Sequence, residues 1–414
     1  METQKTLVNP LYKYTFIWVT FLFFLWGIPN NLNGILIKQF MKSFELSVFQ
    51  ASLVQSVFYI GYFVFALPSA IIMRRYSYKT GLISGLLLFA LGCLLFWPAA
   101  LLGSYFFFLF SLFIIASGLT FLETGANPFI VELGSEQTAE RRLNFSQAFN
   151  PIGSILGVLV GTVFVLSGTD PNETMIENMK SSGIYADYLQ EETLRVVKPY
   201  LCLAIFACIW ILLSLKIHFP EKTKEENEIQ IKSSIFSLLN NSVFMKGVLA
   251  LFLYVGAQVG TWSYFIFYVQ EYTGMDEKQA GYMLSGTLIA FALGRFSATW
   301  LMKCLSPFLL MQIYSMINVV LIVSCIIFTD TLGMWCLLLT SFFMSVMYPT
   351  IFSVGVKGLG HQTKIAGSIL VMAILGGALL TPLMGFIMDR SNVAYAMFVP
   401  LFAYVYIFFY SRKS

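Results

Sequence analysis

The feature that most constrains this chain is a succession of about twelve apolar stretches, each about 20 residues or longer, separated by polar segments. A bilayer core ~30 Å thick requires about 20 apolar residues per spanning helix. Within lipid the backbone must satisfy its own hydrogen bonds, so such stretches fold as helices. The residues are 58% hydrophobic and only 11% charged, which is outside the range of soluble domains. The sequence therefore predicts an all-α integral membrane protein.

The first apolar stretch is too long for a signal peptide, and no small-residue cleavage site follows it. We therefore expect the mature chain to retain it as a spanning helix. The expected spans are residues 15–37, 48–73, 80–100, 104–132, 142–167, 197–217, 243–270, 279–302, 308–329, 333–356, 364–388 and 393–411.

The distribution of Lys and Arg indicates how the chain is oriented in the membrane. If the N-terminus is cytoplasmic, most of the 25 Lys and Arg residues fall on the inner side, as the positive-inside rule requires. We therefore expect both termini to be cytoplasmic. The net charge of +4 is too small to indicate a nucleic-acid partner.

Two longer polar segments divide the series of helices. Residues 168–196 have mixed charge and are expected outside the membrane, whereas residues 219–241 are rich in charge and are expected inside. The second segment predicts an N-terminal six-helix bundle at 1–218, a cytoplasmic linker at 219–241 and a C-terminal six-helix bundle at 242–414.

A weak internal repeat supports two related halves. Gln50 and Ala51 begin one expected helix as Gln279 and Ala280 begin its counterpart, and each helix ends on a cation. Together with the count of helices, this pattern favours the fold of the major facilitator superfamily, with twelve transmembrane helices in two pseudo-symmetric bundles.

One carboxylate, Glu123, lies deep in an expected span. A charge there is costly unless it faces a cavity, is paired or is protonated. Asn127 follows one helical turn later, and Thr120 and Ser117 precede it at three-residue steps, so one face of this helix is polar. The alternative is a protonated carboxyl that only bonds a neighbouring helix.

Two other spans carry amides with the donors and acceptors that suit hydroxyl-rich ligands. In the fifth span Gln147, Asn150 and Ser154 share one side. In the first span Asn30, Asn31 and Asn33 each need an internal hydrogen-bond partner. The glycines of the fifth span, Gly153, Gly157 and Gly161, recur every four residues, which is typical of close helix packing.

The seventh span places Tyr254, Gln258, Thr261 and Trp262 on one face. An aromatic ring beside an amide is a common means of holding a sugar. The alternative is an interfacial aromatic residue and an amide used in packing.

Several cations are candidate gating residues. Arg295 lies within a span, where it pairs with a carboxylate or extends toward the cytoplasmic surface, and we favour a structural or gating role. Arg74, Arg75 and Lys79 lie in an inner loop, and comparison with the superfamily's basic loop motif implies that they latch the inner gate.

The sequence does not support enzyme chemistry, a metal site or a cofactor. The histidines, His218 and His361, are expected at cytoplasmic helix ends, and no Ser or Cys has a plausible base within the membrane. The six cysteines lack CxxC spacing and are expected to be thiols that lie within the membrane.

Several stretches resemble the fucose permease branch of the major facilitator superfamily, whose members are bacterial sugar–proton symporters. These stretches are "FFLWGIPNNLNGIL", "LETGANPFIVELG", "RRLNFSQAFNPIGS", "YVGAQVGTWSYFIFYVQE" and "SVMYPTIFSVGVKGLG". The resemblance implies that Glu123 acts in sugar recognition and proton movement and that Asn150 contacts sugar. The chain departs from the family at Gly34, where the family has an aspartate that is thought to be protonated during transport.

These features together predict a secondary active transporter of fucose or another hexose in the bacterial inner membrane, coupled to protons through Glu123. The sugar-binding candidates are Asn30, Asn33, Glu123, Asn127, Gln147, Asn150, Gln258 and Trp262. Because Gly34 cannot titrate, the alternatives are a sugar facilitator or a differently coupled hexose or N-acetylhexosamine transporter. A non-transporting sugar sensor stays a third possibility, and a monomer is expected.

Overall fold

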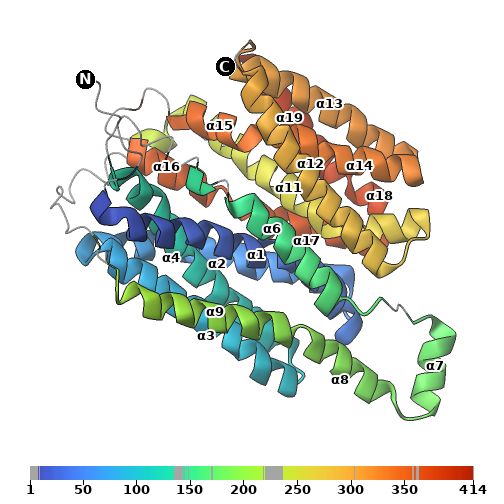
Figure 1. Ribbon diagram of the computed structural model, residues 1–414. Coiled ribbons are helices and arrows are strands. Elements are labelled where there is room, and N and C mark those ends of the chain that lie inside the picture. The colour runs from blue at the N-terminus through green and yellow to red at the C-terminus, as the bar shows by residue number, and fades with distance from the viewer. Residues whose placement is uncertain are drawn as a thin grey trace, which may run out of the picture. The chain divides into compact units, whose positions relative to one another are not determined.

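In the part of the chain that the structure describes, the computed structural model of the protein is built of helices (Figure 1). Among the described residues there is no strand, so the all-α fold class is confirmed. The structure describes residues 8, 10–134, 142, 145–147, 149–168, 171–217, 219, 236–302, 304–356, 359 and 363–413. The expected linker at 219–241 and both histidines therefore lie largely outside the described residues.

The helices of the first half follow the expected spans closely. A short 3-10 helix at Pro10–Tyr12 precedes α1. The helices are α1 Lys13–Ser43, α2 Val48–Arg75, α3 Tyr78–Leu101, α4 Tyr105–Glu132, α6 Phe149–Val160 with a π-helical turn at Gly161–Val165, α7 Glu173–Ser181, α8 Tyr185–Arg195 and α9 Val197–Ser214.

The second half is also helical, and the last three of its expected spans are each divided into two helices. The helices are α11 Ser242–Thr273, α12 Glu277–Leu301, α13 Pro307–Ile327, α14 Thr331–Met344, α15 Met347–Val356, α16 Thr363–Met372, α17 Leu375–Arg390, α18 Val393–Ala396 and α19 Phe398–Lys413. Among the described residues, eleven helices are long and apolar enough to cross a membrane. The remaining expected span is α12, which is long enough at 25 residues and contains Arg295.

The polar segment between the fifth and sixth spans contains two helices that the sequence did not predict. Figure 1 shows α7 and then α8, which runs on into α9. In α8 the Arg195 guanidinium lies 3.4 Å from Glu192 and 3.6 Å from Glu191. Oppositely charged pairs at these spacings stabilise a helix, which explains why a segment of mixed charge is helical.

Polar residues between the apolar stretches set where the helices begin. The hydroxyl of Ser77 accepts from Thr80 N at the start of α3, and that of Ser104 accepts from Phe107 N at the start of α4. Asp276 and Gln279 form a reciprocal capping box at the start of α12. These side chains satisfy backbone N–H groups that a helix leaves without partners.

The described chain forms two compact units whose boundary crosses two helices. The first unit contains residues 1–33, 60–165 and 177–224, and the second contains 34–59, 166–176 and 225–414. In the first unit α3 packs along α4 and α9, and in the second α11 packs along α17 and α19. The connection at 44–47 joins the end of α1 to the start of α2. The end of α1 and the start of α2 thus belong to the second unit.

The α6 backbone packs directly against α1 inside the first unit, as the spacing of the glycines predicted. A Cβ atom added at Gly153 would lie 2.1 Å from the carbonyl oxygen of Phe24, and one at Gly157 would lie 2.4 Å from that of Ile28. This contact holds Asn150 of α6 beside α1.

Gly153→Ala should therefore destabilise the protein, because the methyl group meets a backbone carbonyl that cannot turn away. Overpacking of this kind costs about 1–3 kcal/mol or more. A thermal unfolding assay in detergent should show a clear loss of stability. The matched control is Gly286→Ala in α12, whose Cβ would meet only Leu338 Cδ1 at 3.5 Å. Equal stability of both variants would contradict the packing described.

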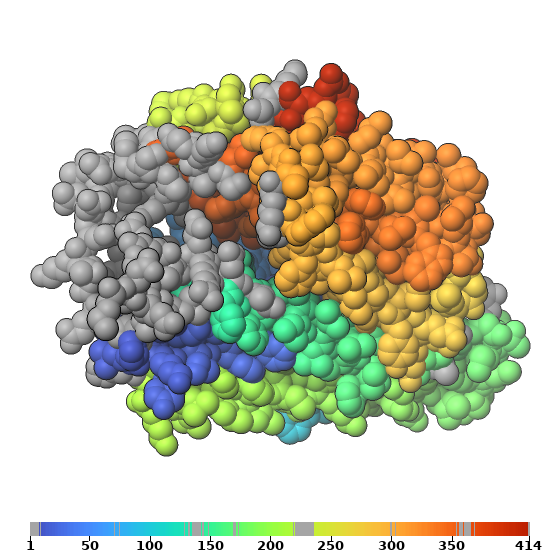
Figure 2. Space-filling view, turned by 45° about the horizontal axis from the view of Figure 1, so that its top comes forward, coloured from blue at the N-terminus to red at the C-terminus, as the bar shows by residue number. Residues whose placement is uncertain are grey.

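The outward face of the second unit is apolar, as a lipid-facing surface requires. Figure 2 shows α13 at the surface. Its exposed side chains include Ile313, Met316, Val320 and Ile327. A surface of this composition suits contact with acyl chains.

Candidate functional site

Three polar side chains from three helices meet within the first unit. Tyr62 of α2 is only 7% exposed, and its hydroxyl donates to Asn30 Oδ1 of α1 at 3.3 Å. Glu123 of α4, which is half-buried, lies beside Tyr62. Sequence analysis singled out Glu123 and Asn30 but missed Tyr62, because a tyrosine in an apolar stretch has no distinguishing signal.

A chain of amides continues from Glu123 along the same side of the unit. Asn127 Nδ2 donates to the backbone oxygen of Glu123 at 3.0 Å, and Gln147 Nε2 donates to Asn127 Oδ1 at 3.2 Å. The structure thus brings together Glu123, Asn127 and Gln147, three of the predicted binding residues. Thr120 does not join them, because its hydroxyl donates to Ala116 O within its own helix.

Asn150 of α6 links two helices and is half-buried. Its Nδ2 donates to the backbone oxygen of Phe23 in α1 at 3.2 Å, while its side-chain oxygen makes no hydrogen bond to the described residues. Asn33 differs, because it is fully buried and neither of its amide atoms has a partner in the described chain. An amide oxygen that the protein leaves open is suited to accept from a ligand hydroxyl.

The predicted residues of α11 belong to the second unit. Trp262 Nε1 donates to Ser341 Oγ of α14 at 3.1 Å, and its ring packs edge-on against Phe291 of α12 at 5.3 Å between centroids. The indole N–H is therefore already used, which leaves the ring face for stacking. Gln258 lies one turn earlier, is half-buried and makes no hydrogen bond to the described residues.

The cations named as gating candidates lie against aromatic rings. The guanidinium of Arg295 is 4.8 Å from the centroid of Phe291, the residue that contacts Trp262. Arg75 lies 5.7 Å from the ring of Tyr76, and Lys79 lies 5.3 Å from that of Phe219. Cations are attracted to the faces of such rings. The side chain of Arg74 is outside the part of the chain that the structure describes.

Gly34 lies where α1 comes close to α11. A Cβ atom added there would lie 3.6 Å from Cα of Ser263 and 3.8 Å from the backbone oxygen of Trp262. Gln55 of α2 reaches the same place, where its Nε2 donates to Ser263 Oγ at 3.0 Å. Gly34 is thus part of a contact between helices.

A polar cluster that sequence analysis missed lies at the end of α1 within the second unit. Lys42 Nζ is 3.1 Å from Glu277 Oε2 and donates to Ser167 Oγ at 2.8 Å. The side chains of Lys42 and Glu277 are 8% and 0% exposed. We call Lys42, Ser167 and Glu277 the outer cluster, since the predicted topology places these residues at the outer side of the membrane.

A second contact fastens the start of α2 to the end of α17. The carboxylate of Asp389 accepts from the backbone N–H groups of Val48 and Phe49, both at 2.8 Å. A carboxylate at a helix N-terminus is stabilised by the helix dipole and by charge-assisted hydrogen bonds. Residues so far apart in the chain carry no mutual signal in one sequence, so sequence analysis could not pair them.

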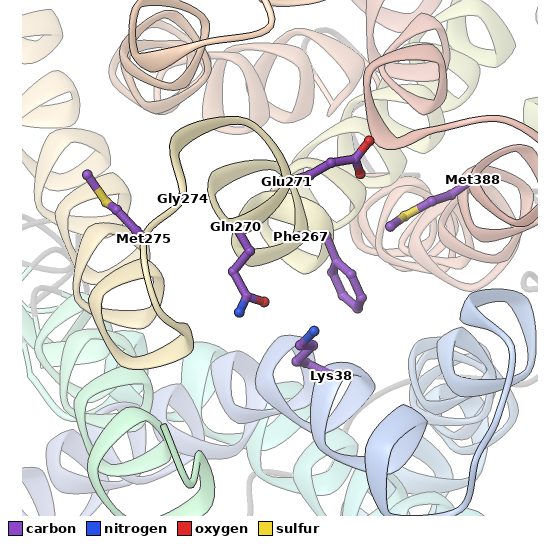
Figure 3. A pocket seen from close by; sticks show the side chains of 7 residues that line it. All are labelled: Lys38, Phe267, Gln270, Glu271, Gly274, Met275 and Met388. Atoms are coloured by element: carbon purple, nitrogen blue, oxygen red, sulfur yellow. The ribbon is translucent and has the colours of Figure 1, made fainter. Parts of the chain in front are cut away.

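A pocket of about 390 Å³ lies beside the outer cluster in the second unit. Figure 3 shows Lys38 of α1 pointing toward Phe267 and Gln270 of α11. The ammonium of Lys38 is 5.2 Å from the centroid of the Phe267 ring. The pocket contains none of the predicted sugar-binding residues; its lining is Lys38, Phe267, Gln270, Glu271, Gly274, Met275 and Met388.

Comparison with known proteins matches the chain to transporters. The family model of the Major Facilitator Superfamily matches residues 19–380. The L-fucose-proton symporter of Escherichia coli (strain K12) is 40% identical over 397 residues, which are 94% of this chain and 91% of the relative. A putative glucose/galactose transporter of Helicobacter pylori (strain ATCC 700392 / 26695) is 34% identical over 403 residues, 96% of this chain and 95% of the relative.

A solved structure supports the same assignment. The crystal structure of the Major Facilitator Superfamily transporter FucP in the outward conformation matches with a TM-score of 0.74 and 40% identity, covering 97% of this chain and 99% of that one. The relatives are transporters, which confirms the expectation that the chain is not an enzyme. The matched regions include every stretch on which the resemblance rested. The chain belongs to the Major Facilitator Superfamily and, within it, to the fucose permease group of multi-pass membrane transporters.

Proposed function

We propose that this protein takes up a monosaccharide together with a proton by alternating access. The observation that carries the proposal is the carboxyl of Glu123, which lies inside a spanning helix against Tyr62 and one turn from Asn127. An ionisable group at membrane depth is costly and typically marks a substrate or proton pathway. Relatives named as L-fucose-proton symporters support the coupling to protons.

The substrate class is a hydroxyl-rich monosaccharide. Amides supply both donors and acceptors, and the open amide oxygen of Asn150 suits a sugar hydroxyl. The relatives are named for L-fucose and for glucose or galactose, and we take these three sugars as the first candidates, with an N-acetylated hexose next. The residues proposed to contact sugar are Asn30, Asn33, Glu123, Asn127, Gln147, Asn150, Gln258 and Trp262.

Sugar-dependent proton movement in liposomes tests the proposal. With purified protein and an imposed pH gradient, addition of a transported sugar should drive protons across the membrane in the direction of sugar flow. Empty liposomes and a non-transported sugar serve as controls. Sugar uptake without any proton flux would contradict symport. Absence of counterflow of labelled sugar would instead indicate a sensor.

A second candidate function, facilitated diffusion, is favoured by Gly34. The contact of Gly34 with the α11 backbone provides no titratable side chain where the family has an aspartate. A coupled transporter needs a group whose protonation differs between its states. A facilitator would equilibrate sugar across the liposome membrane but would not concentrate it under a pH gradient.

The topology that accompanies the proposal places both termini in the cytoplasm of a bacterial cell, with the protein a monomer in the inner membrane. The N-terminal bundle is 1–218, the linker 219–241 and the C-terminal bundle 242–414. The inner loop cations Arg74, Arg75 and Lys79 and the membrane cation Arg295 are the proposed gating residues. Labelling of single cysteines in intact cells with an impermeant reagent tests this orientation.

We further propose that the outer cluster is part of the outer gate. In the second unit, Lys42 joins the end of α1 to Glu277 of α12, and Asp389 joins the end of α17 to the start of α2. Alternating access requires contacts at one side of the membrane that form in one state and break in the other. Buried charged contacts suit that purpose because they are specific in geometry.

A further inference from the structure

The indole of Trp262 is held by two other helices within the second unit. Its Nε1 donates to Ser341 Oγ of α14 at 3.1 Å. Its ring meets that of Phe291 of α12 at 5.3 Å between centroids and 84° between planes. Ser341 is fully buried, and Phe291 is 8% exposed. The hydrogen bond fixes the N–H group and the perpendicular ring fixes the plane, so together they restrict the indole to one orientation.

The backbone that carries Trp262 is held as well. A Cβ atom added at Gly34 of α1 would lie 3.8 Å from the backbone oxygen of Trp262. The next residue of α11, Ser263, is only 2% exposed, and its hydroxyl accepts from Gln55 Nε2 of α2 at 3.0 Å. Since both backbone and ring are fixed, Trp262 loses little further freedom when a ligand stacks on it. Such preorganisation favours binding.

The bond to Ser341 also decides how Trp262 contacts a ligand. An indole carries one N–H group, which only donates, and here that donor is committed to the protein. The edge-on contact with Phe291 covers at most one of the two faces of the indole, and the Trp262 side chain is half-buried. What Trp262 offers to a sugar is therefore a ring face, on which the C–H groups of a sugar stack.

We propose that Ser341 is a positioning residue for sugar binding, which holds the indole of Trp262 so that it binds by its ring face and not by its N–H group. The inference rests on the proposed function, in which Trp262 contacts the sugar. Without the Ser341 hydroxyl the indole N–H group loses its acceptor, and the ring turns to find another. The stacking face then leaves the position in which it meets the sugar.

Ser341→Ala tests the proposal because it removes the hydroxyl and little else. Binding of L-fucose, D-glucose, D-galactose and N-acetyl-D-glucosamine is measured by calorimetry on the full-length protein. For the sugar that the unaltered protein binds most tightly, Ser341→Ala should weaken binding about tenfold, equivalent to about 1.4 kcal/mol. In counterflow of labelled sugar, KM should rise to the same extent while the maximal rate is unchanged, as expected for an interaction that serves binding alone.

A second background shows whether Ser341 acts through the indole. Trp262→Phe keeps an aromatic face and removes the N–H group. If Ser341 positions the indole, Ser341→Ala should change the affinity of the Trp262→Phe protein by less than about twofold. An equal loss of affinity in both backgrounds would overturn the proposal, because Ser341 would then act independently of Trp262.

Ser345→Ala is the matched control, because it makes the same substitution at another fully buried serine of the second unit. The hydroxyl of Ser345 donates to Phe342 O at 2.7 Å, a contact along its own helix, so sugar affinity should be unchanged.

Ser341→Cys covers the case in which Ser341→Ala does not fold. A thiol fills the place of the hydroxyl but accepts hydrogen bonds only weakly. This variant should also lower sugar affinity when Trp262 is present, and should leave it unchanged in the Trp262→Phe background. Unchanged affinity in the presence of Trp262 would overturn the proposal.

The outcomes separate this proposal from the function on which it rests. If the unaltered protein binds none of the four sugars, the proposed function fails and the positioning role fails with it. If the unaltered protein binds sugar and Ser341→Ala binds it equally well, the positioning role is wrong, while sugar transport still stands.

Discussion

Glu123→Gln should abolish the accumulation of sugar driven by a pH gradient, while exchange of labelled sugar across the membrane continues. Glutamine cannot titrate, so binding and release of sugar are no longer linked to a proton. The variant should therefore resemble the permanently protonated protein, with sugar affinity that is independent of pH.

Proteoliposomes loaded with unlabelled sugar measure the two activities side by side. Counterflow should remain within about tenfold of the unaltered protein, a loss of no more than about 1.4 kcal/mol in transition-state stabilisation, whereas net concentration of sugar should vanish. Glu177→Gln in α7 is the matched control, because Glu177 is exposed in a helix outside the spanning segments. A Glu123→Gln protein that still concentrates sugar against its gradient would contradict the role given to this residue.

Lys42→Met should open the outer cluster. The variant leaves the carboxylate of Glu277, which is fully buried, without the ammonium 3.1 Å away. Removing one partner of a buried pair costs about 3–5 kcal/mol, because the remaining buried charge loses its counter-ion. The arrangement in which this cluster is closed should therefore lose population. The test uses a protein in which the six free cysteines are replaced and Ser52→Cys is introduced. An impermeant maleimide should label this cysteine at least about tenfold faster when Lys42→Met is present than when Lys42 is retained, since every 1.4 kcal/mol is a factor of ten.

A double variant separates charge from packing in this prediction. Lys42→Met combined with Glu277→Gln removes the uncompensated charge, so labelling should return toward the original rate. Lys180→Met should leave the rate unchanged, because Lys180 is an exposed lysine of the polar segment whose ammonium lies 4.8 Å from the centroid of the Tyr185 ring. Unaltered labelling in Lys42→Met alone would show that the outer cluster does not control access to α2.

The site was only partly predictable from the sequence, and the individual residues show why. Glu123 and the amides are visible because polar groups are rare in spanning helices and costly there. Tyr62 is not visible, since tyrosine is common in such helices and only its neighbours give its hydroxyl a role. Trp262 was predicted as a sugar-stacking residue, but its N–H bond to Ser341 depends on a helix 79 positions away in the chain.

The sequence by itself determined the spanning helices, the membrane environment and the family, because each follows from local hydropathy or a contiguous motif. The tertiary structure decided which polar groups share a proton or a charge. The bond of Tyr62 to Asn30, the pair of Lys42 with Glu277 and the capping of α2 by Asp389 join residues from different helices. Such contacts depend on how helices pack side by side. The spacing of residues along the chain does not show which helices are neighbours.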